Sequence, residues 1–506
     1  MLTLILFAVV ISLLSLIYYW AYEKQKYWKV RDIPHIRSPI LLGHFYKTVL
    51  LKESNISALS YLYNHPDAIG KPFVGINVFH KPTVLLRDPD LIKRILITDF
   101  QHFPNHHTGA DPVYDPIGGQ NLFQIKNPHW RELRVKLSPT FTSGKMKQMF
   151  YMVENVGNIL GETVDGLVKS GKPDVEMRSL LARFTIDSIS IVAFGTESGC
   201  LKNPETSEFL QAAQISFQNR YVDKVAGQLL FFLSNFTKVL RVKTLHPTFE
   251  AFLRRLYHEV MTNRMKNGDT RNDLIDTLIA LKQAKVAKGE LVMSDDILIA
   301  QAAVFFFAGF ETSSSTLEFF FYLIAKHPKI QTKIRQEIFE ALAKHGKMNY
   351  ELIANDLPYL TAALKETLRL YPILPFLDRE CDAMEGYSME PYSSFKIPRG
   401  MPVYIPIYSL QRDPEYFPDP DHFIPERFYS DNGTTNEFLW LPFSTGPRNC
   451  IGERFAMMQM RVAIVSLLKS YSVELIDGSP KSIELDKEGA FLHSKQPITL
   501  KLVAAS

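Results

Sequence analysis

LPFSTGPRNCIGERFA, from Leu441 to Ala456, is the most specific segment of this chain. It opens with turn-forming residues, presents one cysteine, Cys450, and then begins an apolar periodic pattern that predicts a helix to about Leu468. A cysteine just before a helix has backbone amides and the positive end of the helix dipole facing its sulfur, which favours the thiolate. The segment therefore predicts either a nucleophile or a metal ligand.

The residues around the cysteine favour a flat ligand. Gly446 and Gly452 would let the backbone approach such a ligand closely, Phe443 would pack against it, and Arg448 would supply a cation at its edge. These are the requirements of a haem bound through a thiolate. Two other interpretations stay open, an inert buried cysteine and a catalytic nucleophile with a histidine base. Neither accounts for the glycine pair and Phe443 together.

A second unusual segment is a helix predicted from about Ser294 to Lys326. Its middle is apolar on nearly all sides, so the helix should pass through the centre of the body. Gly309, Glu311 and the hydroxyl run 312–315 are unexpected there, because glycine weakens a helix and a buried carboxylate needs a partner. A helix crossing would explain the hydroxyl groups but not the glutamate, so the segment indicates a functional site.

The composition excludes several classes of protein. Of 506 residues, 46% are hydrophobic and 22% charged, which is typical of a globular chain and not of a disordered or multi-span one. Basic residues exceed acidic ones by four, so no nucleic-acid footprint covers the chain. Three cysteines without a CxxC pair argue against a disulfide framework or a four-cysteine zinc site, and fit a reducing compartment.

The first residues predict a membrane anchor. Met1 to Tyr22 contains no charged residue, and Leu2 to Trp20 is long enough to cross a bilayer once as a helix. Basic residues follow this span and none precedes it, which places the body in the cytosol. The alternative is a cleaved signal peptide, which is disfavoured because no basic segment precedes the span and no small-residue cleavage site ends it.

The chain divides into a transmembrane anchor at 1–22, a linker with Pro and Gly at 23–45 and a catalytic body at 46–506. The body should be mainly α with small β-sheets. Helical periodicity occurs near the following residues: Asp88, Asn127, Glu176, Leu274, Ile330 and Thr361. Strands are predicted in three short segments: KPTVLLR from Lys81, MPVYIPIY from Met401 and QPITLKLV from Gln496.

Four motifs together resemble one family. Residues 443–452, FSTGPRNCIG, are similar to the haem-binding signature of the cytochrome P450 monooxygenases. AGFET at 308–312 resembles the family's oxygen-activation motif, ETLR at 366–369 its ExxR element and PERF at 425–428 its PERF element. LSPTFTSGKMKQM at 137–149 is similar to the insect family-six and vertebrate family-three enzymes. The resemblance implies the cytochrome P450 fold, with haem between the central helix and the cysteine loop.

The resemblance also assigns roles to residues of this chain. Cys450 would be the metal ligand, and the cofactor would be haem b (iron protoporphyrin IX). The residues expected to contact the haem are Phe443, Gly446, Arg448, Gly452, Trp130, Arg134 and Arg379, of which Trp130 and the three arginines would bind propionates. The residues expected to form a buried clamp are Glu366, Arg369 and Arg427.

The residues expected to serve catalysis are Ala308 and Gly309, which would leave room for oxygen, and Glu311 and Thr312, which would relay protons. One loop departs from the pattern. Related insect sequences tend to have Asp-Arg-Gly where this chain reads Asn105-His-His-Thr-Gly109, so His106 and His107 are given no haem role.

A thiolate ligand favours O–O cleavage, so the expected reaction inserts one oxygen atom from O2 into a substrate. The chain has no convincing flavin or nicotinamide fingerprint, which implies that electrons come from NADPH through NADPH–cytochrome P450 reductase, with cytochrome b5 as a further donor, at the endoplasmic reticulum membrane. The basic residues proposed to face the reductase are Lys93, Arg94, Arg131, Lys136, Lys145, Lys147 and Arg454. The alternatives are a reductase-independent haem-thiolate carrier, sensor or peroxide isomerase, and a non-haem membrane hydrolase. The pair Glu311-Thr312 argues against the haem-thiolate alternatives, and an active protein without haem would identify the hydrolase.

The predicted substrate pocket is strongly apolar. Its expected residues are Phe305, Phe306, Phe310, Leu374, Phe376, Leu377, Phe217 and Phe491. Such walls bind flat or bulky hydrophobic molecules and offer few directional contacts. Hydrophobic foreign compounds, including plant toxins and insecticides, are therefore the predicted substrates, and a dedicated steroid or fatty acid is the alternative.

Overall fold

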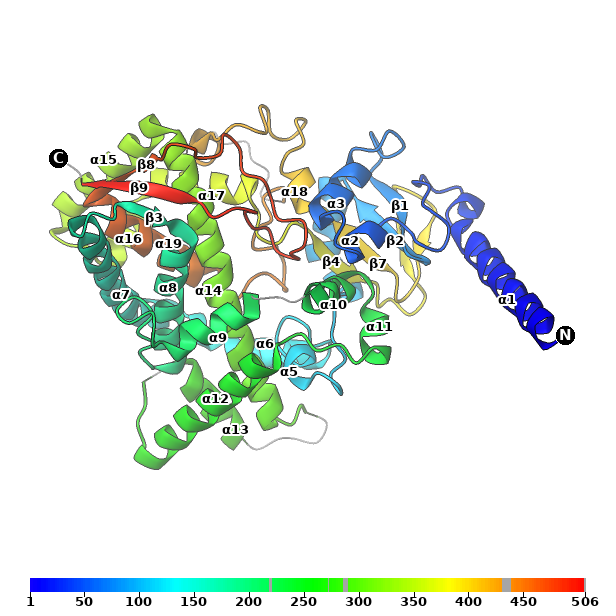
Figure 1. Cartoon of the computed structure of the whole chain (residues 1–506), viewed down its shortest axis with the longest axis horizontal. Helices are drawn as coiled ribbons and strands as arrows, with labels where there is room; N and C mark the ends of the chain where they lie inside the picture. Colours follow the sequence, from blue (N-terminus) through cyan, green and yellow to red (C-terminus); the bar gives the residue numbers. More distant parts are fainter. Residues whose placement is uncertain (218–220, 272, 285–289, 430–437, 505–506) are drawn as a thin grey trace.

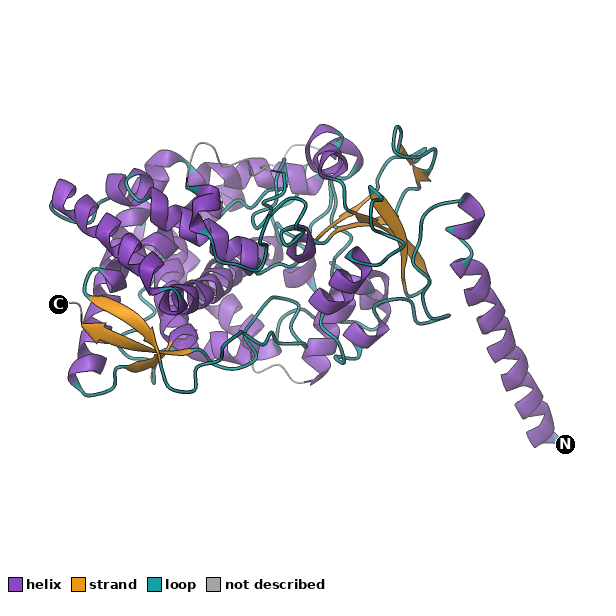
Figure 2. Cartoon of the chain, turned by 90° about the horizontal axis from the view of Figure 1, so that it is seen from above, coloured by secondary structure: helices purple, strands orange, loops and turns teal. Residues whose placement is uncertain are grey.

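The computed structural model of the chain describes residues 1–506 except 218–220, 272, 285–289, 430–437 and 505–506 (Figure 1). Helices make up most of the body, and the described residues form three small sheets at its edges (Figure 2). The predicted fold class, mainly α with small sheets and an N-terminal apolar helix, is confirmed.

The long helix α14 (Asp295–Lys326) runs through the middle of the body (Figure 1). The side chain of Ser294 caps it by accepting a hydrogen bond from the backbone N–H of Ile297, and its last residue precedes the His327-Pro328 pair. Most of its side chains are buried, as expected for a helix that is apolar on nearly all sides. The predicted central helix is therefore confirmed.

The described residues contain further helices of six or more residues. They are α1 (Leu2–Gln25), α3 (Asn55–Tyr63), α6 (His129–Leu137), α7 (Ser143–Lys169), α8 (Met177–Ile189), α9 (Glu208–Phe217), α10 (Tyr221–Phe232), α11 (Ser234–Val239), α12 (Pro247–Asn267), α13 (Leu274–Gln283), α15 (Pro328–His345), α16 (Tyr350–Asn355), α17 (Pro358–Leu370) and α19 (Glu453–Leu468). The short helices are α2 (Tyr46–Val49), α4 (Pro89–Lys93), α5 (Pro116–Gly119) and α18 (Ile407–Leu410). Helix α8 packs along α14, and α19 packs on α7.

The largest sheet has the strand order β1-β2-β7-β4, built from β1 (Phe73–Val78), β2 (Lys81–Leu86), β7 (Pro402–Ile405) and β4 (Leu377–Glu380). Strands β2 and β7 are parallel, and the other pairs are antiparallel. The second sheet has the order β3-β9-β8, from β3 (Asp174–Glu176), β9 (Thr499–Ala504) and β8 (Tyr471–Leu475), and β5 (Tyr387–Ser388) pairs with β6 (Lys396–Ile397). Figure 2 shows the four-stranded sheet near α1 and the three-stranded sheet at the other end of the body.

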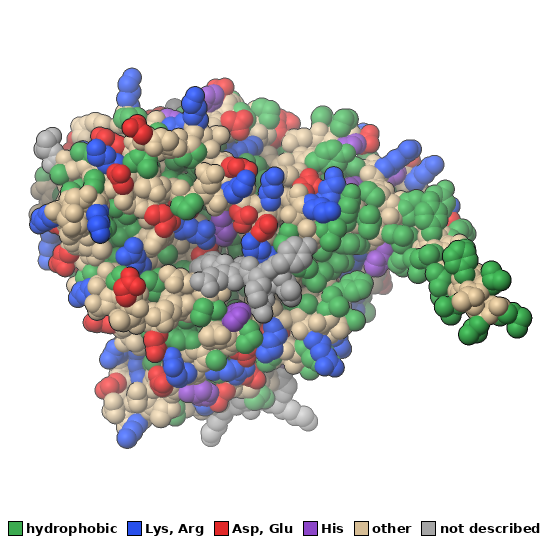
Figure 3. All heavy atoms as spheres, in the orientation of Figure 1, with side chains coloured by type: hydrophobic (Ala, Val, Ile, Leu, Met, Phe, Trp, Pro, Cys, Tyr) green, Lys and Arg blue, Asp and Glu red, His purple; other side chains and the backbone are tan. Residues whose placement is uncertain are grey.

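Helix α1 projects from the body and is a candidate membrane span with mean hydropathy 2.5 (Figures 1 and 3). Hydrophobic side chains cover it and continue onto the adjoining end of the body (Figure 3). The segment after it, predicted as a linker, packs onto the four-stranded sheet. Trp28 is fully buried there, and its indole N–H donates to the carbonyl oxygen of Ile76 at 3.0 Å. This segment therefore attaches the helix to the body.

Candidate functional site

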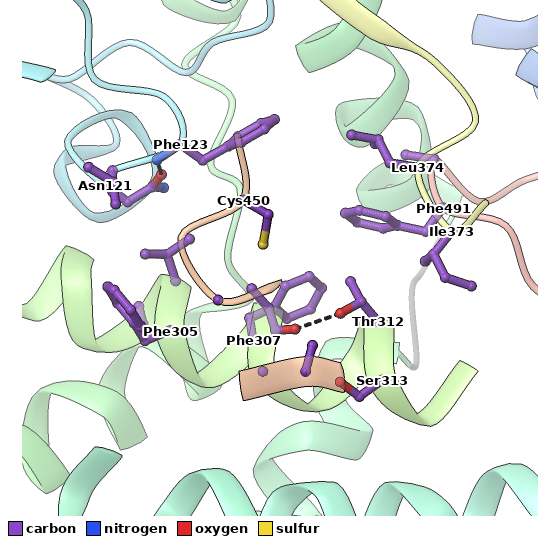
Figure 4. A pocket seen from close by; sticks show the side chains of 18 of the residues that line it. Asn121, Phe123, Phe305, Phe307, Thr312, Ser313, Ile373, Leu374, Cys450 and Phe491 are labelled. Atoms are coloured by element: carbon purple, nitrogen blue, oxygen red, sulfur yellow. Dashed lines mark hydrogen bonds between the residues drawn. The ribbon is translucent and has the colours of Figure 1, made fainter. Parts of the chain in front are cut away.

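A cavity of about 840 Å³ lies between α14, the loop that carries Cys450 and the loop before β9. Figure 4 shows the sulfur of Cys450 pointing into this cavity, with Phe305, Phe307 and Thr312 of α14 on one side and Phe491 on another. The two segments that the sequence singled out thus form facing walls of one cavity.

Backbone contacts shape the cysteine loop before α19 begins. The N–H group of Cys450 donates to the carbonyl oxygen of Phe443 at 2.8 Å, and that of Asn449 donates to Gly446 at 3.0 Å. Gly446 has φ +75°, and a Cβ atom there would lie 2.0 Å from the carbonyl oxygen of Leu96. The glycine is therefore required by the chain's own packing, and Gly446 does not line the cavity. The predicted approach of this glycine to a flat ligand stays a prediction.

Cys450 is exposed in the protein without a ligand, and its thiol lines the cavity. Burial raises the pKa of Cys450 to about 11, although the backbone N–H groups of Gly452 and Glu453 favour the thiolate. The predicted helix start next to Cys450 is thus present. In the protein without a ligand, however, burial raises the pKa of the thiol by more than the backbone N–H groups lower it. A metal cation bound to the sulfur would reverse this balance.

Two arginines on the cavity wall hold the cysteine loop. Arg134 of α6 donates from Nη1 and Nη2 to the backbone oxygen and the Oδ1 of Asn449, both at 2.9 Å. Arg448 donates to the carbonyl oxygens of Pro104, Phe123 and Ile125, and its guanidinium lies 4.4 Å from the ring centre of Trp130. Burial, and then repulsion from Arg379, lower the pKa of Arg448 to about 8.

A third arginine, Arg379, is fully buried next to this wall but does not line the cavity. Among the described residues, its Nε has no hydrogen-bond partner. Asp378 is the carboxylate that interacts with Arg379 and Arg448, while Arg134 adds another cation. Buried cations in excess call for anionic partners. The site therefore fits a ligand that has carboxylates at its edge and a metal that accepts a sulfur ligand, as haem does.

The atypical loop contributes to the same wall. His106 lines the cavity, and its Nδ1 lies 3.0 Å from Oδ1 of Asp378 and 3.3 Å from Nη1 of Arg379. The Nδ1 of His107 lies 3.0 Å from Oε2 of Glu380. The two histidines thus pair with the acidic residues of β4. No local sequence pattern predicts these contacts, because the partners of the histidines are about 270 residues away.

On α14, three of the predicted catalytic residues, Ala308, Gly309 and Thr312, line the cavity. The hydroxyl of Thr312 donates to the carbonyl oxygen of Ala308 at 2.8 Å, and Ala308 is exposed toward the cavity. Glu311 is buried behind this wall, where its Oε1 lies 2.8 Å from Nη2 of Arg178. Burial raises the pKa of Glu311 to about 7, opposed by Arg178.

The predicted clamp residues meet in a buried cluster. Arg369 of α17 binds Glu366 with two hydrogen bonds of 2.7 and 2.8 Å, and both side chains are fully buried. Arg427 lies 3.4 Å from the same carboxylate. Arg369 also donates to the carbonyl oxygens of Gln411, Pro420 and His422, so the cluster fastens α17 to the segment that leads into the cysteine loop.

The predicted pocket residues divide into two groups. Phe305, Leu374, Leu377 and Phe491 line the cavity. Phe306, Phe310 and Phe376 do not. Phe306 packs against Phe194, Phe209 and Phe249, and Phe376 packs against Phe231, Phe232 and Tyr404, so both belong to the hydrophobic core, where Phe310 is also fully buried. The side chain of Phe217 lies outside the described part of the structure. Phe307, which the sequence analysis did not select, lies on the wall with its ring centre 6.0 Å from that of Phe491.

Comparison with known proteins gives matches over nearly the whole chain. The family model for cytochrome P450 matches residues 41–502. The chain is 39% identical to probable cytochrome P450 6g2 of Drosophila melanogaster, covering 99% of this chain and 98% of that protein. It is 38% identical to cytochrome P450 6a8 of the same species, with 99% of each covered. Cytochrome P450 6j1 of Blattella germanica is 35% identical over 92% of this chain and 91% of its own length.

Proposed function

The chain belongs to the cytochrome P450 family, and we propose that it is a haem-thiolate monooxygenase that acts on hydrophobic foreign compounds, including plant toxins and insecticides. One observation carries the proposal. The sulfur of Cys450 and the hydroxyl-bearing residue Thr312 lie on different walls of one largely apolar cavity (Figure 4). This arrangement provides a metal ligand and a proton-transferring group around one reaction space.

When bound, haem supplies the activation of O2 that a thiolate ligand favours. Cys450 would hold its iron, and Arg134, Arg448 and Arg379 would neutralise its propionates, with Trp130 alongside. Phe443 and Gly452, which line the cavity, would contact the ring. Arginine suits the propionates because its planar fork can bind a carboxylate through two hydrogen bonds.

Residues of α14 would transfer protons to the cavity and leave open space at its wall. The Thr312 hydroxyl is bonded to Ala308 in this structure, so it must turn from that carbonyl to pass a proton into the cavity. Glu311 is the adjacent acid, and its raised pKa places proton gain and loss near neutral pH. Ala308 leaves open space at the wall because its side chain ends at Cβ.

The cavity walls support an apolar substrate. Phe305, Phe307 and Phe491 contribute aromatic surface, and Leu374 and Leu377 contribute aliphatic surface. Walls of this kind bind by burial of apolar area and impose few directional contacts, which favours a range of substrates over one polar molecule. The relatives of the insect family-six group support the same proposal.

NADPH–cytochrome P450 reductase is the proposed electron donor, with cytochrome b5 as a second donor and the endoplasmic reticulum membrane as the site of action. Arg131 on α6 and Arg454 on α19 are exposed on the two helices that meet at the cysteine loop, which supports an acidic partner docking there. Lys93 and Lys147 are also exposed, although Lys147 is paired with Glu351 at 2.9 Å.

The direct test is the spectrum of the reduced protein with carbon monoxide. We expect the red-shifted Soret band of thiolate-ligated haem, and we expect Cys450→Ser to remove it. Cys200→Ser and Cys381→Ser are matched controls, because both cysteines are buried away from the cavity. Loss of the band in a control but not in Cys450→Ser would contradict the assignment.

Substrate range is tested separately with a panel of unrelated apolar compounds. The proposal expects several of them to shift the haem spectrum and to be oxidised in the presence of reductase and NADPH. Turnover of one steroid or fatty acid alone, with the rest of the panel inert, would overturn the proposed substrate class.

A further inference from the structure

Glu311 makes a second contact, which comes from the other end of the chain. The Nε2 atom of His493 lies 3.1 Å from Oε1 of Glu311, the same oxygen that Arg178 contacts at 2.8 Å. Neither contact occupies the second carboxylate oxygen. His493 itself lines the cavity, whereas Glu311 lies behind the wall. A histidine of the cavity wall thus holds the buried acid next to Thr312.

The histidine also contacts a serine on the same helix. Its Nδ1 lies 3.4 Å from the hydroxyl oxygen of Ser315. A tautomer with hydrogen on Nε2 would present a donor toward Glu311, and the Ser315 hydroxyl lies between the ring and the same carboxylate, with which it also interacts. Burial, and then the charge of Arg178, lower the pKa of His493 to about 3, which keeps the ring neutral.

The loop around His493 is fixed to the body at several points. The N–H of Leu492 donates to the carbonyl oxygen of Ile373 at 2.9 Å, and the side chain of Asn55 donates to the carbonyl oxygen of Ala490 at 3.0 Å. Phe491, two residues before His493, faces the cavity (Figure 4). One short loop therefore contributes both an apolar wall for the substrate and a polar contact with the buried acid.

We propose that His493 is a positioning residue for proton delivery, which holds the carboxylate of Glu311 in place behind the wall that carries Thr312. The inference rests on the proposed monooxygenase function. The charged groups around Glu311 are Arg178 from α8 and, at longer range, Glu318 from α14, which in turn interacts with Glu176 from β3. Arg178 contacts the same oxygen as His493, and the side chain of Ser315 also interacts with this carboxylate, so removal of the histidine takes away one of three polar contacts of Glu311.

The experiment uses the full-length, haem-loaded protein with reductase, NADPH and an apolar compound that it oxidises. His493→Phe keeps a flat ring but removes the donor. Product formed per NADPH should fall several-fold, because Glu311 loses the polar contact that fixes it next to Thr312. The pH profile of coupling should also shift toward higher pH, because the carboxylate loses one of its polar contacts.

Two further variants separate positioning from loop stability. His493→Gln retains an N–H donor at a similar reach, so it should restore coupling and the original pH profile. Glu484→Gln removes the exposed Lys495–Glu484 ion pair of the same loop without touching Glu311, and it should leave both readouts unchanged. If the phenylalanine variant does not retain haem, His493→Asn replaces it, because the shorter amide cannot reach Glu311.

The outcomes are distinct. Equal coupling in His493→Phe and the unaltered protein, failure of His493→Gln to restore coupling, or uncoupling by Glu484→Gln would each overturn the positioning role. The reduced carbon monoxide band is recorded for every variant. Its absence from the unaltered protein would instead contradict the proposed function, so the two failures cannot be confused.

Discussion

Gly309 and Ile189 face each other where α14 and α8 pack together. A Cβ atom at Gly309 would lie 2.7 Å from both Cδ1 and Cγ1 of Ile189. The glycine therefore allows the two helices to approach closely, a role that a motif interpretation centred on oxygen does not contain. Gly309 also lines the cavity, so the position of α8 and the shape of the cavity depend on the same residue.

We expect Gly309→Ala to lower stability even though alanine is the better helix former, because overpacking costs about 1–3 kcal/mol. Ile189→Ala in the same protein should recover most of the loss, since it removes both clashing atoms. The temperature at which haem is lost measures the effect. Equal stability of the single variant and the unaltered protein would show that α8 shifts freely.

Thr312→Ala should leave haem content and substrate binding largely intact while more NADPH is spent on peroxide. The substitution removes the hydroxyl next to Glu311 but no group that would hold the haem. The measurement compares product and peroxide formed per NADPH. Thr316→Ala is a matched control on the same helix, because its hydroxyl bonds the Thr312 carbonyl at 2.8 Å. Unchanged coupling in Thr312→Ala would remove this residue from the proton route.

Substitutions in the buried clamp should lower the stability of the protein by unequal amounts. Glu366→Ala leaves Arg369 fully buried without its carboxylate, which should cost about 3–5 kcal/mol. Arg427→Ala should cost less, because Arg427 is partly exposed and its contact is longer at 3.4 Å. Denaturant unfolding of the two proteins gives the comparison. The reverse order would mean that Arg427 carries the cluster.

The buried side chain of Glu318 should make the free energy of unfolding depend on pH. It is buried on α14, and burial raises its pKa to about 8, opposed by Arg178. The folded state therefore binds a proton more tightly than the unfolded state, so stability is highest below the ordinary pKa of glutamate and falls as pH rises toward 8. Glu318→Gln should lose this contribution. Unfolding midpoints at pH 6 and pH 8 should differ less in the variant than in the unaltered protein.

The elements that the sequence predicted are those whose signals are local. The caps and apolar period of α14, the end of α19 at Leu468 and strands such as β2 each depend on neighbouring residues. The prediction of pocket-lining side chains was wrong where a helix is apolar on all sides. Phe305 and Phe306 are adjacent, and periodicity could not show which one faces the cavity.

Contacts between segments that are far apart in the sequence have no local sequence pattern that predicts them. The approach of His493 to Glu311 joins residues 182 positions apart in number, and the pairing of His106 with Asp378 joins residues 272 apart. The sequence also does not show which atoms a side chain at a glycine position would contact. Gly446 was interpreted through a ligand, whereas the carbonyl of Leu96 explains it.

The hydrogen bonds of Arg448 also constrain when the site can be assembled. Its partners are the carbonyl oxygens of Pro104, Phe123 and Ile125, more than 320 residues earlier in the chain. During synthesis those carbonyls leave the ribosome long before the arginine does. The early segment must therefore wait, with its acceptors hydrated, until nearly the whole chain has been made. Under the proposed function, haem capture at Cys450 would therefore come late, after nearly the whole chain has been made.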